Sequence, residues 1–301
     1  MALIPPKKNF LILTSDSGFG HRSAANAVAK AIKLQHPQGA IVRVVNPLLA
    51  EGSSAFLKTT ELNYDHMVKN NPVWYRIAYD ISDSRPASMI VENTLVIAMY
   101  RNMRRLILES KPDAILSTNQ MFGAPAGTVL SLMKRKPAFF TAVTDLADVH
   151  AMWFNSNPDR FFVASDDVRL KAANNGISLD KITISGIPVD PEFETSPRIK
   201  QEMRIRLGLD PQLTTLLFVG SRRVSGIFDH LKALEGYSFP FQVVVIAGGD
   251  YDLYQQCIQH TWGFPMHVEN YVQNMPEWML GADLLVTKAG GLILSEGLAA
   301  G

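Results

Sequence analysis

The fold is decided by residues 284–301, which read LLVTKAGGLILSEGLAAG. Their apolar, β-branched start predicts a strand ending near Thr287, and the leucine- and alanine-rich part after Gly290-Gly291 predicts a helix. A strand, a glycine turn and a helix in this order build parallel sheets that bind nucleotides. The unpaired N–H groups at the start of such a helix can hold a diphosphate. Glu296 then lies where a carboxylate can accept hydrogen bonds from sugar hydroxyls.

The same alternation of strands and helices extends over the whole chain and predicts an α/β protein with parallel sheets. Residues 190–197 are rich in proline and acid, so we predict a linker there between two doubly wound domains, 1–190 and 198–301. Ligands of such sheets bind beyond the carboxyl ends of the strands, which predicts a site in a cleft between the domains. The expected strands are residues 9–14, 41–45, 114–117, 138–143, 160–164, 215–219, 242–247 and 283–287.

Composition narrows the class of protein. A net charge of +1 argues against a nucleic-acid binder that relies on bulk charge. The single cysteine allows no internal disulfide and fits a reducing cytosol. The N-terminal segment does not resemble a signal peptide, and no apolar run approaches the length that spans a bilayer. The last helix stops at Gly301 without a cap, so we expect the second domain to be incomplete.

The first glycine loop, residues 14–22, reads TSDSGFGHR and precedes a helix rich in small residues. It is not the dinucleotide fingerprint, because Gly18 and Gly20 lack the third glycine. A helix N-terminus disfavours imidazolium, so His21 is expected to stay neutral and to be able to accept a proton from a substrate hydroxyl. The alternative is a histidine that only caps the helix.

Asp145 follows the predicted strand at residues 138–143 and therefore lies at the same sheet edge. It can orient a base or bind an acceptor hydroxyl, but it can equally cap the next turn. Trp153 and Phe154 are more typical of core packing than of a stacking platform.

A second glycine loop, residues 218–226, reads FVGSRRVSG. Gly220 and Gly226 bracket it, and Arg222 is a candidate for contact with phosphate oxygens. Two solvated arginines are the alternative interpretation. The seven histidines are scattered and the cysteine has no partner at a metal-ligand spacing, so we expect no metal and no other cofactor.

Residues 94–108, TLVIAMYRNMRRLIL, predict a basic amphipathic helix. Such a helix can lie on an anionic bilayer, or it can be a surface helix with its apolar stripe in the core. The apolar stripe is Leu95, Met99, Met103 and Leu106, and the basic side is Arg101, Arg104 and Arg105.

Taken in order, these motifs resemble the monogalactosyldiacylglycerol synthase group of glycosyltransferases, which includes bacterial processive diacylglycerol glucosyltransferases. The resemblance covers nearly the whole chain. Its anchors are SGFGHR (17–22), VTDL (143–146), GIPV (186–189), NMPEWM (274–279) and TKAGG (287–291) followed by Glu296.

The resemblance implies two Rossmann-like domains facing across a cleft, the GT-B type, and inverting transfer of a hexose from UDP-glucose or UDP-galactose to diacylglycerol. The first domain, 1–190, would be the acceptor and membrane side, and the second, 198–301, would bind the UDP-sugar. The resemblance also implies a cytoplasmic enzyme held peripherally on an anionic membrane. His21 matches the family's general base, and Asp145 is expected to orient it or the acceptor. The expected donor-binding residues are Gly220, Arg222, Lys288, Gly290, Gly291 and Glu296, and the acceptor or membrane side is Gly18, Gly20, Arg101, Arg104 and Arg105.

This chain departs from the family pattern in both glycine loops. The first loop lacks the usual three consecutive glycines, and the second carries arginines where the family is glycine-rich. Three alternatives therefore stay open: a UDP-sugar-dependent transferase with another lipid acceptor, a UDP-sugar 2-epimerase, or a degenerate nucleotide-sugar-binding protein.

Overall fold

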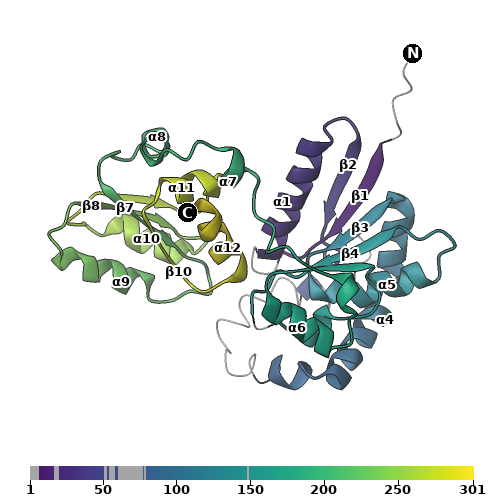
Figure 1. The fold of residues 1–301 in the computed structure, drawn as a ribbon. Helices are drawn as coiled ribbons and strands as arrows, with labels where there is room; N and C mark the ends of the chain where they lie inside the picture. The colour runs from purple at the N-terminus through teal and green to yellow at the C-terminus, as the bar shows by residue number, and fades with distance from the viewer. Residues whose placement is uncertain are drawn as a thin grey trace, which may run out of the picture. The chain divides into compact units, whose positions relative to one another are not determined.

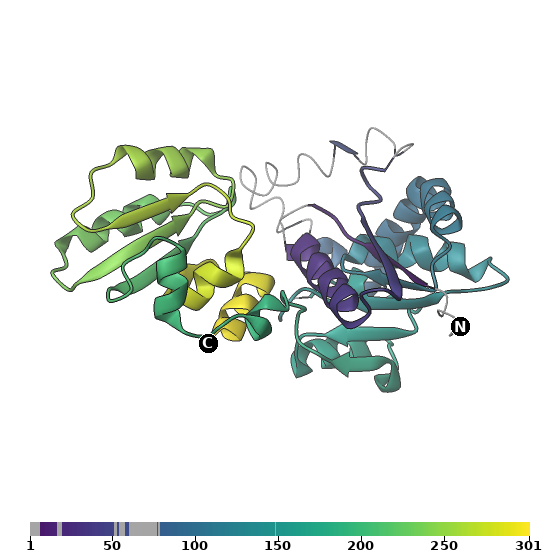
Figure 2. The same cartoon turned by 90° about the horizontal axis from the view of Figure 1, so that it is seen from above.

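The computed structural model describes residues 7–16, 20–50, 53, 58–59, 77, 79–147 and 149–301. Contacts divide the chain into two units, Met1–Asp190 and Pro191–Gly301. Each unit is built on its own parallel sheet with helices packed against it (Figures 1 and 2). The predicted α/β class with two doubly wound units is therefore confirmed, while the acceptor and donor roles of the units stay predictions.

The first unit contains most of the described strands. In chain order its elements, with η for a 3-10 turn, are β1 (Lys8–Leu13), α1 (Gly20–Gln35), β2 (Ala40–Val45), α4 (Arg85–Ser110), β3 (Ala114–Ser117), η1 (Gln120–Phe122), α5 (Gly123–Ser131), β4 (Ala138–Ala142), η2 (Ala151–Trp153), β5 (Arg160–Val163), α6 (Asp166–Asn174), η3 (Leu179–Lys181) and β6 (Ile182–Ile184).

The strands of this unit lie in the order β2-β1-β3-β4-β5-β6, and every described pair is parallel. The chain moves outward from β1 to β2 and then crosses to the other side of β1 to form β3. The switch point of the sheet is therefore between β1 and β3, which is where ligands of doubly wound sheets bind.

The alternation of side chains along β1 explains why helices cover both faces of this sheet. Leu11 and Leu13 pack in one core cluster with Met99 and Met103 of α4, whereas Ile12 packs with alanines of α1 on the other face. Those alanines are fully or nearly buried, and their small size lets α1 lie close to the strands. The position of α1 matters because its first turn carries His21.

The second unit forms a four-stranded parallel sheet in the order β10-β7-β8-β9. Its switch point lies between β7 and β10, the strands that precede the two predicted donor loops. In chain order its elements are α7 (Glu192–Thr195), α8 (Lys200–Arg206), β7 (Thr214–Val219), α9 (Ile227–Ala233), η4 (Leu234–Gly236), β8 (Phe241–Ile246), α10 (Tyr251–Gln259), β9 (Met266–Glu269), α11 (Met275–Gly281), β10 (Leu284–Thr287) and α12 (Gly291–Ala300).

An ion pair between buried Arg204 and exposed Asp283 lies at the start of β10. Arg204 of α8 is 5% exposed and bonds both the carbonyl of Gly281 and the carboxylate of Asp283. Burial raises the pKa of Asp283, but hydrogen bonds from the backbone N–H of Thr215 and from Lys200, with the charge of Arg204, lower it below its usual value overall. This pair sets the register at which β10 enters the sheet beside β7.

The structure corrects two sequence predictions and adds two strands. The basic helix begins at Arg85, not near residue 94, and Ile107 is fully buried in its apolar stripe, whereas Leu106 is only partly buried. Strands β6 and β9 were not predicted, because both are short edge strands that lack a fully apolar run. In the part of the chain that the structure describes, no helix is long and apolar enough to cross a membrane.

Candidate functional site

In the first unit, the carboxyl ends of β1 and β3 meet at the switch point. The N–H of Thr118, which follows β3, bonds the carbonyl of Leu13 at the end of β1. The Thr118 hydroxyl bonds the carbonyl of His21 at 3.0 Å and so fixes the first turn of α1 to the end of β3. Gly20 begins α1, while Gly18 lies outside the described residues. His21 is therefore placed where a ligand of this sheet would bind.

The imidazole of His21 is held by a residue that sequence reasoning gave no role. Nδ1 of His21 lies 2.7 Å from the hydroxyl of Thr144, which follows β4 and is 5% exposed. The ring centroids of His21 and Trp153 are 6.0 Å apart, with the rings tilted by 54°. The histidine that the glycine loop carries is thus oriented by residues from two other loops.

Asp145 makes a different contact from the one expected of an orienting carboxylate. Its Oδ2 accepts a hydrogen bond from the indole N–H of Trp153 at 2.8 Å. Trp153 is 1% exposed and Phe154 is fully buried, in agreement with the core packing expected of them. Asp145 therefore holds the Trp153 ring, which lies beside His21.

Asp16, which follows β1, is held by one charged and one neutral side chain. Asp16 pairs with Arg22 at 2.6 Å and accepts a hydrogen bond from the amide of Asn46 at 2.8 Å. Burial raises the pKa of Asp16, but the hydrogen bonds from Arg22 and Asn46 and the charge of Arg22 lower it overall. Asp16 is therefore a poor base at neutral pH, although it lies near His21 in the sequence.

His150 supports the short turn η2, which carries Trp153. Its Nδ1 accepts the N–H of Met152 at 3.1 Å, so the neutral ring carries its proton on Nε2 and donates to Ser82 at 3.0 Å. Burial lowers the pKa of His150, and the charge of Asp83 only partly opposes this. The ring is a neutral structural group that anchors the turn η2, which carries Trp153.

In the second unit, the two predicted donor loops flank the switch point between β7 and β10. The hydroxyl of Thr287, the last residue of β10, bonds the carbonyl of Val219, the last residue of β7, at 3.1 Å. Gly220 follows β7 and lies so close to Gly248 that a Cβ on Gly248 would overlap the Gly220 carbonyl. The spacing of these backbones therefore depends on glycine.

Helix α12 opens from Gly290, which has an extended backbone, and no described side chain caps it. Gly290 and Gly291 are partly exposed, and a Cβ added to Gly290 would lie 3.7 Å from Cε of Lys288. A lysine chain thus runs beside an uncapped helix N-terminus, an arrangement that suits an anion. Glu296 lies half-buried in the second turn of the same helix.

In this structure the side chain of Arg222 bonds the backbone of the second unit. Its Nε donates to the carbonyl of Gly249 at 3.0 Å, in the loop that follows β8. The side chain is exposed. Its contact with phosphate oxygens stays a prediction, for which the terminal guanidinium nitrogens would be the donors.

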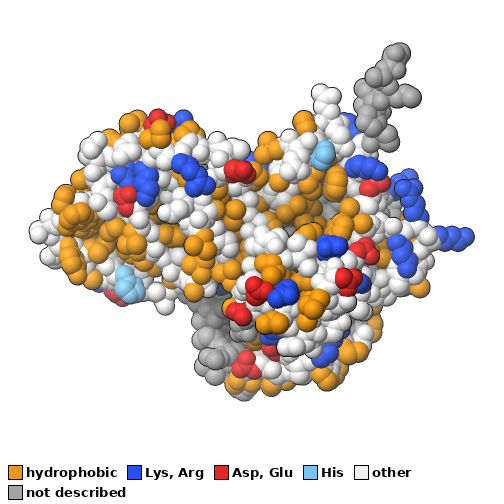
Figure 3. Space-filling view, viewed as in Figure 1, with side chains coloured by type: hydrophobic (Ala, Val, Ile, Leu, Met, Phe, Trp, Pro, Cys, Tyr) orange, Lys and Arg blue, Asp and Glu red, His pale blue; other side chains and the backbone are white. Residues whose placement is uncertain are grey.

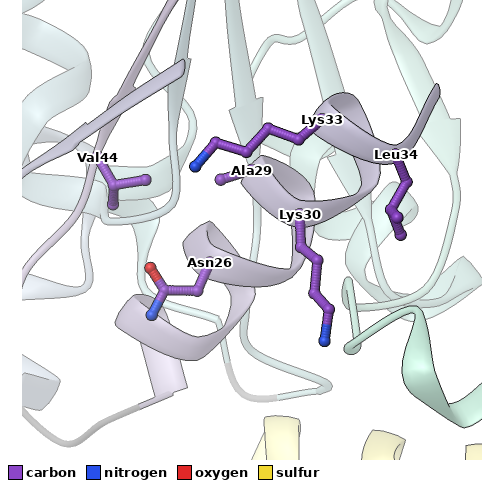
Figure 4. Close-up of a pocket in the computed structure, with 6 residues that line it drawn as sticks. All are labelled: Asn26, Ala29, Lys30, Lys33, Leu34 and Val44. Atoms are coloured by element: carbon purple, nitrogen blue, oxygen red, sulfur yellow. The ribbon is translucent and has the colours of Figure 1, made fainter. Parts of the chain in front are cut away.

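A separate surface pocket of about 390 Å³ lies between α1 and β2 (Figure 4). Two lysines of α1, Lys30 and Lys33, contribute to it, and Lys30 pairs with Asp190 at 2.8 Å. The pocket contains none of the predicted site residues. Its lining is Asn26, Ala29, Lys30, Lys33, Leu34 and Val44.

The family model described as monogalactosyldiacylglycerol (MGDG) synthase matches residues 21–189. Monogalactosyldiacylglycerol synthase 2 of Arabidopsis thaliana is 28% identical over 97% of this chain and 64% of its own length. The corresponding synthase of Spinacia oleracea is 28% identical over 98% of this chain and 58% of its own length. The chain thus spans about three-fifths of the length of these relatives.

Solved structures share the fold at low sequence identity. The Anabaena HepE complex with UDP-glucose has a TM-score of 0.55 and 13% identity, over 97% of this chain and 78% of that one. Acinetobacter baumannii MurG has a TM-score of 0.53 and 16% identity, over 98% and 77%. A UDP-GlcNAc 2-epimerase from Neisseria meningitidis has a TM-score of 0.51 and 12% identity, over 94% and 78%.

At this identity the structural neighbours establish only the GT-B type of fold, which transferases and epimerases share. The family model identifies the family, because its match covers more than half of the chain and begins at His21. The motifs at both switch points lie in the order that the resemblance requires. The chain belongs to the monogalactosyldiacylglycerol synthase family.

Proposed function

We propose that the protein transfers a hexose from a UDP-sugar to diacylglycerol with inversion at the anomeric carbon. The family assignment supports the reaction class. The observation that carries the proposal is His21, held on Thr144 at the switch point of the first unit. The lipid product of this reaction would be a β-linked glycosyl diacylglycerol.

The proposed step is a single displacement. The acceptor hydroxyl attacks the anomeric carbon while its proton passes to His21, and the bond from that carbon to the β-phosphate oxygen breaks. The departing diphosphate gains negative charge, which the first N–H groups of α12 and the ammonium of Lys288 would stabilise. Glu296, farther along α12, would accept hydrogen bonds from the ribose hydroxyls.

The direct test incubates the complete protein with diacylglycerol vesicles and either UDP-glucose or UDP-galactose, followed by mass spectrometry of the lipids. We expect one glycosyl diacylglycerol and release of UDP that depends on the vesicles. An epimerised UDP-sugar formed without acceptor would support the epimerase instead. UDP binding with no turnover on any lipid would support the degenerate binding protein.

The same proposal includes contact with an anionic membrane through α4. Opposite its buried stripe, this helix exposes Ile90, 70%, and Ile97, 83%, together with Arg101 and Arg104. Their spacing places them on one helix face. Basic and acidic side chains otherwise both occur over the visible surface in Figure 3, in line with the net charge of +1. An isoleucine and arginine face suits lipid tails and anionic headgroups.

The double variant Ile97→Ser with Arg101→Gln is expected to weaken binding to anionic vesicles by about tenfold or more. Each basic side chain near such a surface contributes about 1 kcal/mol, and the isoleucine adds burial of apolar area. Vesicle flotation at several salt concentrations measures the change. The matched control is Ile205→Ser with Arg206→Gln on α8, where both residues are also exposed. Equal losses in both double variants would remove α4 from the membrane contact.

A further inference from the structure

Thr144 and Asp145 are neighbours in the sequence but act on different partners. The hydroxyl of Thr144 lies 2.7 Å from Nδ1 of His21, whereas the carboxylate of Asp145 bonds the indole of Trp153 at 2.8 Å. The side chain of Asp145 is therefore linked to the imidazole through the tryptophan ring. The group that contacts Nδ1 of the proposed base is the Thr144 hydroxyl.

The surroundings make this contact difficult to replace. Thr144 is 5% exposed and Trp153 is 1% exposed, so water has little access to this side of the ring. The indole stands beside the imidazole with centroids 6.0 Å apart, and Thr118 holds the His21 carbonyl at 3.0 Å. His21 is thus held at its backbone carbonyl by Thr118, beside its ring by Trp153 and at Nδ1 by Thr144. The contact to Thr144 acts directly on a ring nitrogen, Nδ1.

We propose that Thr144 is a positioning residue that sets the tautomer of His21. Its hydroxyl oxygen accepts the proton on Nδ1, which leaves the lone pair on Nε2. Nε2 can then take the proton of the acceptor hydroxyl, so the inference rests on the proposed function. In the opposite arrangement the Thr144 hydroxyl donates to Nδ1, Nε2 carries the proton, and the ring cannot act as a base there.

A hydroxyl in this position has a chemical consequence. A carboxylate would stabilise the imidazolium that forms after proton transfer by its charge, whereas a neutral hydroxyl fixes tautomer and orientation without an ion pair. The ring therefore returns its proton more readily after each turnover than a carboxylate-paired histidine would. Asp145 contributes by holding Trp153, so its conversion to asparagine, whose amide oxygen can still accept the indole N–H, should leave the tautomer unchanged.

The test combines imidazole ¹⁵N NMR with kinetics on wild type, Thr144→Val and Thr144→Ser, with the His21 signal assigned by its loss in His21→Ala. We expect the Nδ1–H tautomer in the wild type and in Thr144→Ser, and a mixture or Nε2–H in Thr144→Val. In the transfer assay, Thr144→Val should lower kcat by about 10- to 100-fold with KM for the UDP-sugar unchanged, and Thr144→Ser should restore most of the rate.

The NMR result decides the proposal independently of turnover. An Nε2–H tautomer in the wild type would overturn it, and so would an unchanged tautomer in Thr144→Val. Full kcat in Thr144→Val would also overturn it, because the hydroxyl would then be dispensable. If the wild type makes no glycolipid, the proposed function fails, while the tautomer still shows whether Thr144 acts on His21 as inferred.

Discussion

His21→Ala is expected to lower kcat for glycosyl transfer by about 100- to 10,000-fold, the usual contribution of a positioned general base. The carboxylates of Asp145 and Asp16 are poor replacements for it in this structure. Asp145 accepts the indole N–H of Trp153, and Asp16 is paired with Arg22 and Asn46, which lower its pKa. The dissociation constant for UDP should stay within about twofold, because the proposed donor residues belong to the second unit.

Two measurements check this expectation: glycolipid formation from labelled UDP-sugar, and UDP binding by calorimetry. His36→Ala is the matched control, since His36 is exposed just beyond the end of α1 and its backbone bonds Ile32 and Gly39. Its turnover should equal that of the wild type. If His21→Ala also turned over at the wild-type rate, His21 would have no part in the chemistry, and the role proposed for Thr144 would lose its purpose.

The parts of the fold that sequence predicts well are those decided by local patterns. Buried parallel strands such as β1 and β8 are apolar almost throughout, so their runs are visible without structure. The turn at Gly290-Gly291 was predicted because a strand and a helix bracket it. In contrast, β9 reads Met-His-Val-Glu and is half-exposed at the sheet edge, so no apolar run marks it.

The candidate site shows the same division. His21 was found because it stands at the mouth of a glycine loop, a feature of neighbouring residues. Thr144 was present in a quoted motif, yet its contact joins residues that are 123 positions apart, and only the order of strands brings them together. Polar residues that directly follow adjacent parallel strands are the signal that would have pointed to Thr144 and Thr118.

The close approach of Gly220 and Gly248 is another contact that sequence could not show. Gly248 has a φ of +63°, and a Cβ there would overlap the carbonyl oxygen of Gly220 and lie 2.9 Å from its carbonyl carbon. Neither atom is the end of a flexible side chain, so the two loops themselves would have to move apart. The loops after β7 and β8 are therefore packed backbone to backbone, next to the switch point proposed to bind the donor.

Gly248→Ala is expected to destabilise the second unit by about 3 kcal/mol or more, since a left-handed residue costs about 1–2 kcal/mol and overpacking adds about 1–3 kcal/mol. Cys257 provides the measurement, because it is the single cysteine of the chain, is 1% exposed and belongs to the core of this unit. Burial raises its pKa to about 11, so a thiol reagent labels it mainly after opening. Labelling of Gly248→Ala should therefore be about 100-fold faster than that of the wild type.

Two further glycines of the same unit separate the causes. Gly208 has a φ of +71° but nothing within 4 Å of an added Cβ, so Gly208→Ala carries only the backbone cost of about 1–2 kcal/mol. Gly263 has open space and no left-handed backbone, so Gly263→Ala should change stability by less than about 1 kcal/mol. Labelling rates should rise in the order Gly263→Ala, Gly208→Ala, Gly248→Ala. Equal rates for Gly208→Ala and Gly248→Ala would show that the Gly220 carbonyl can move away without loss of stability. The spacing of the donor-side loops would then not depend on a glycine at position 248.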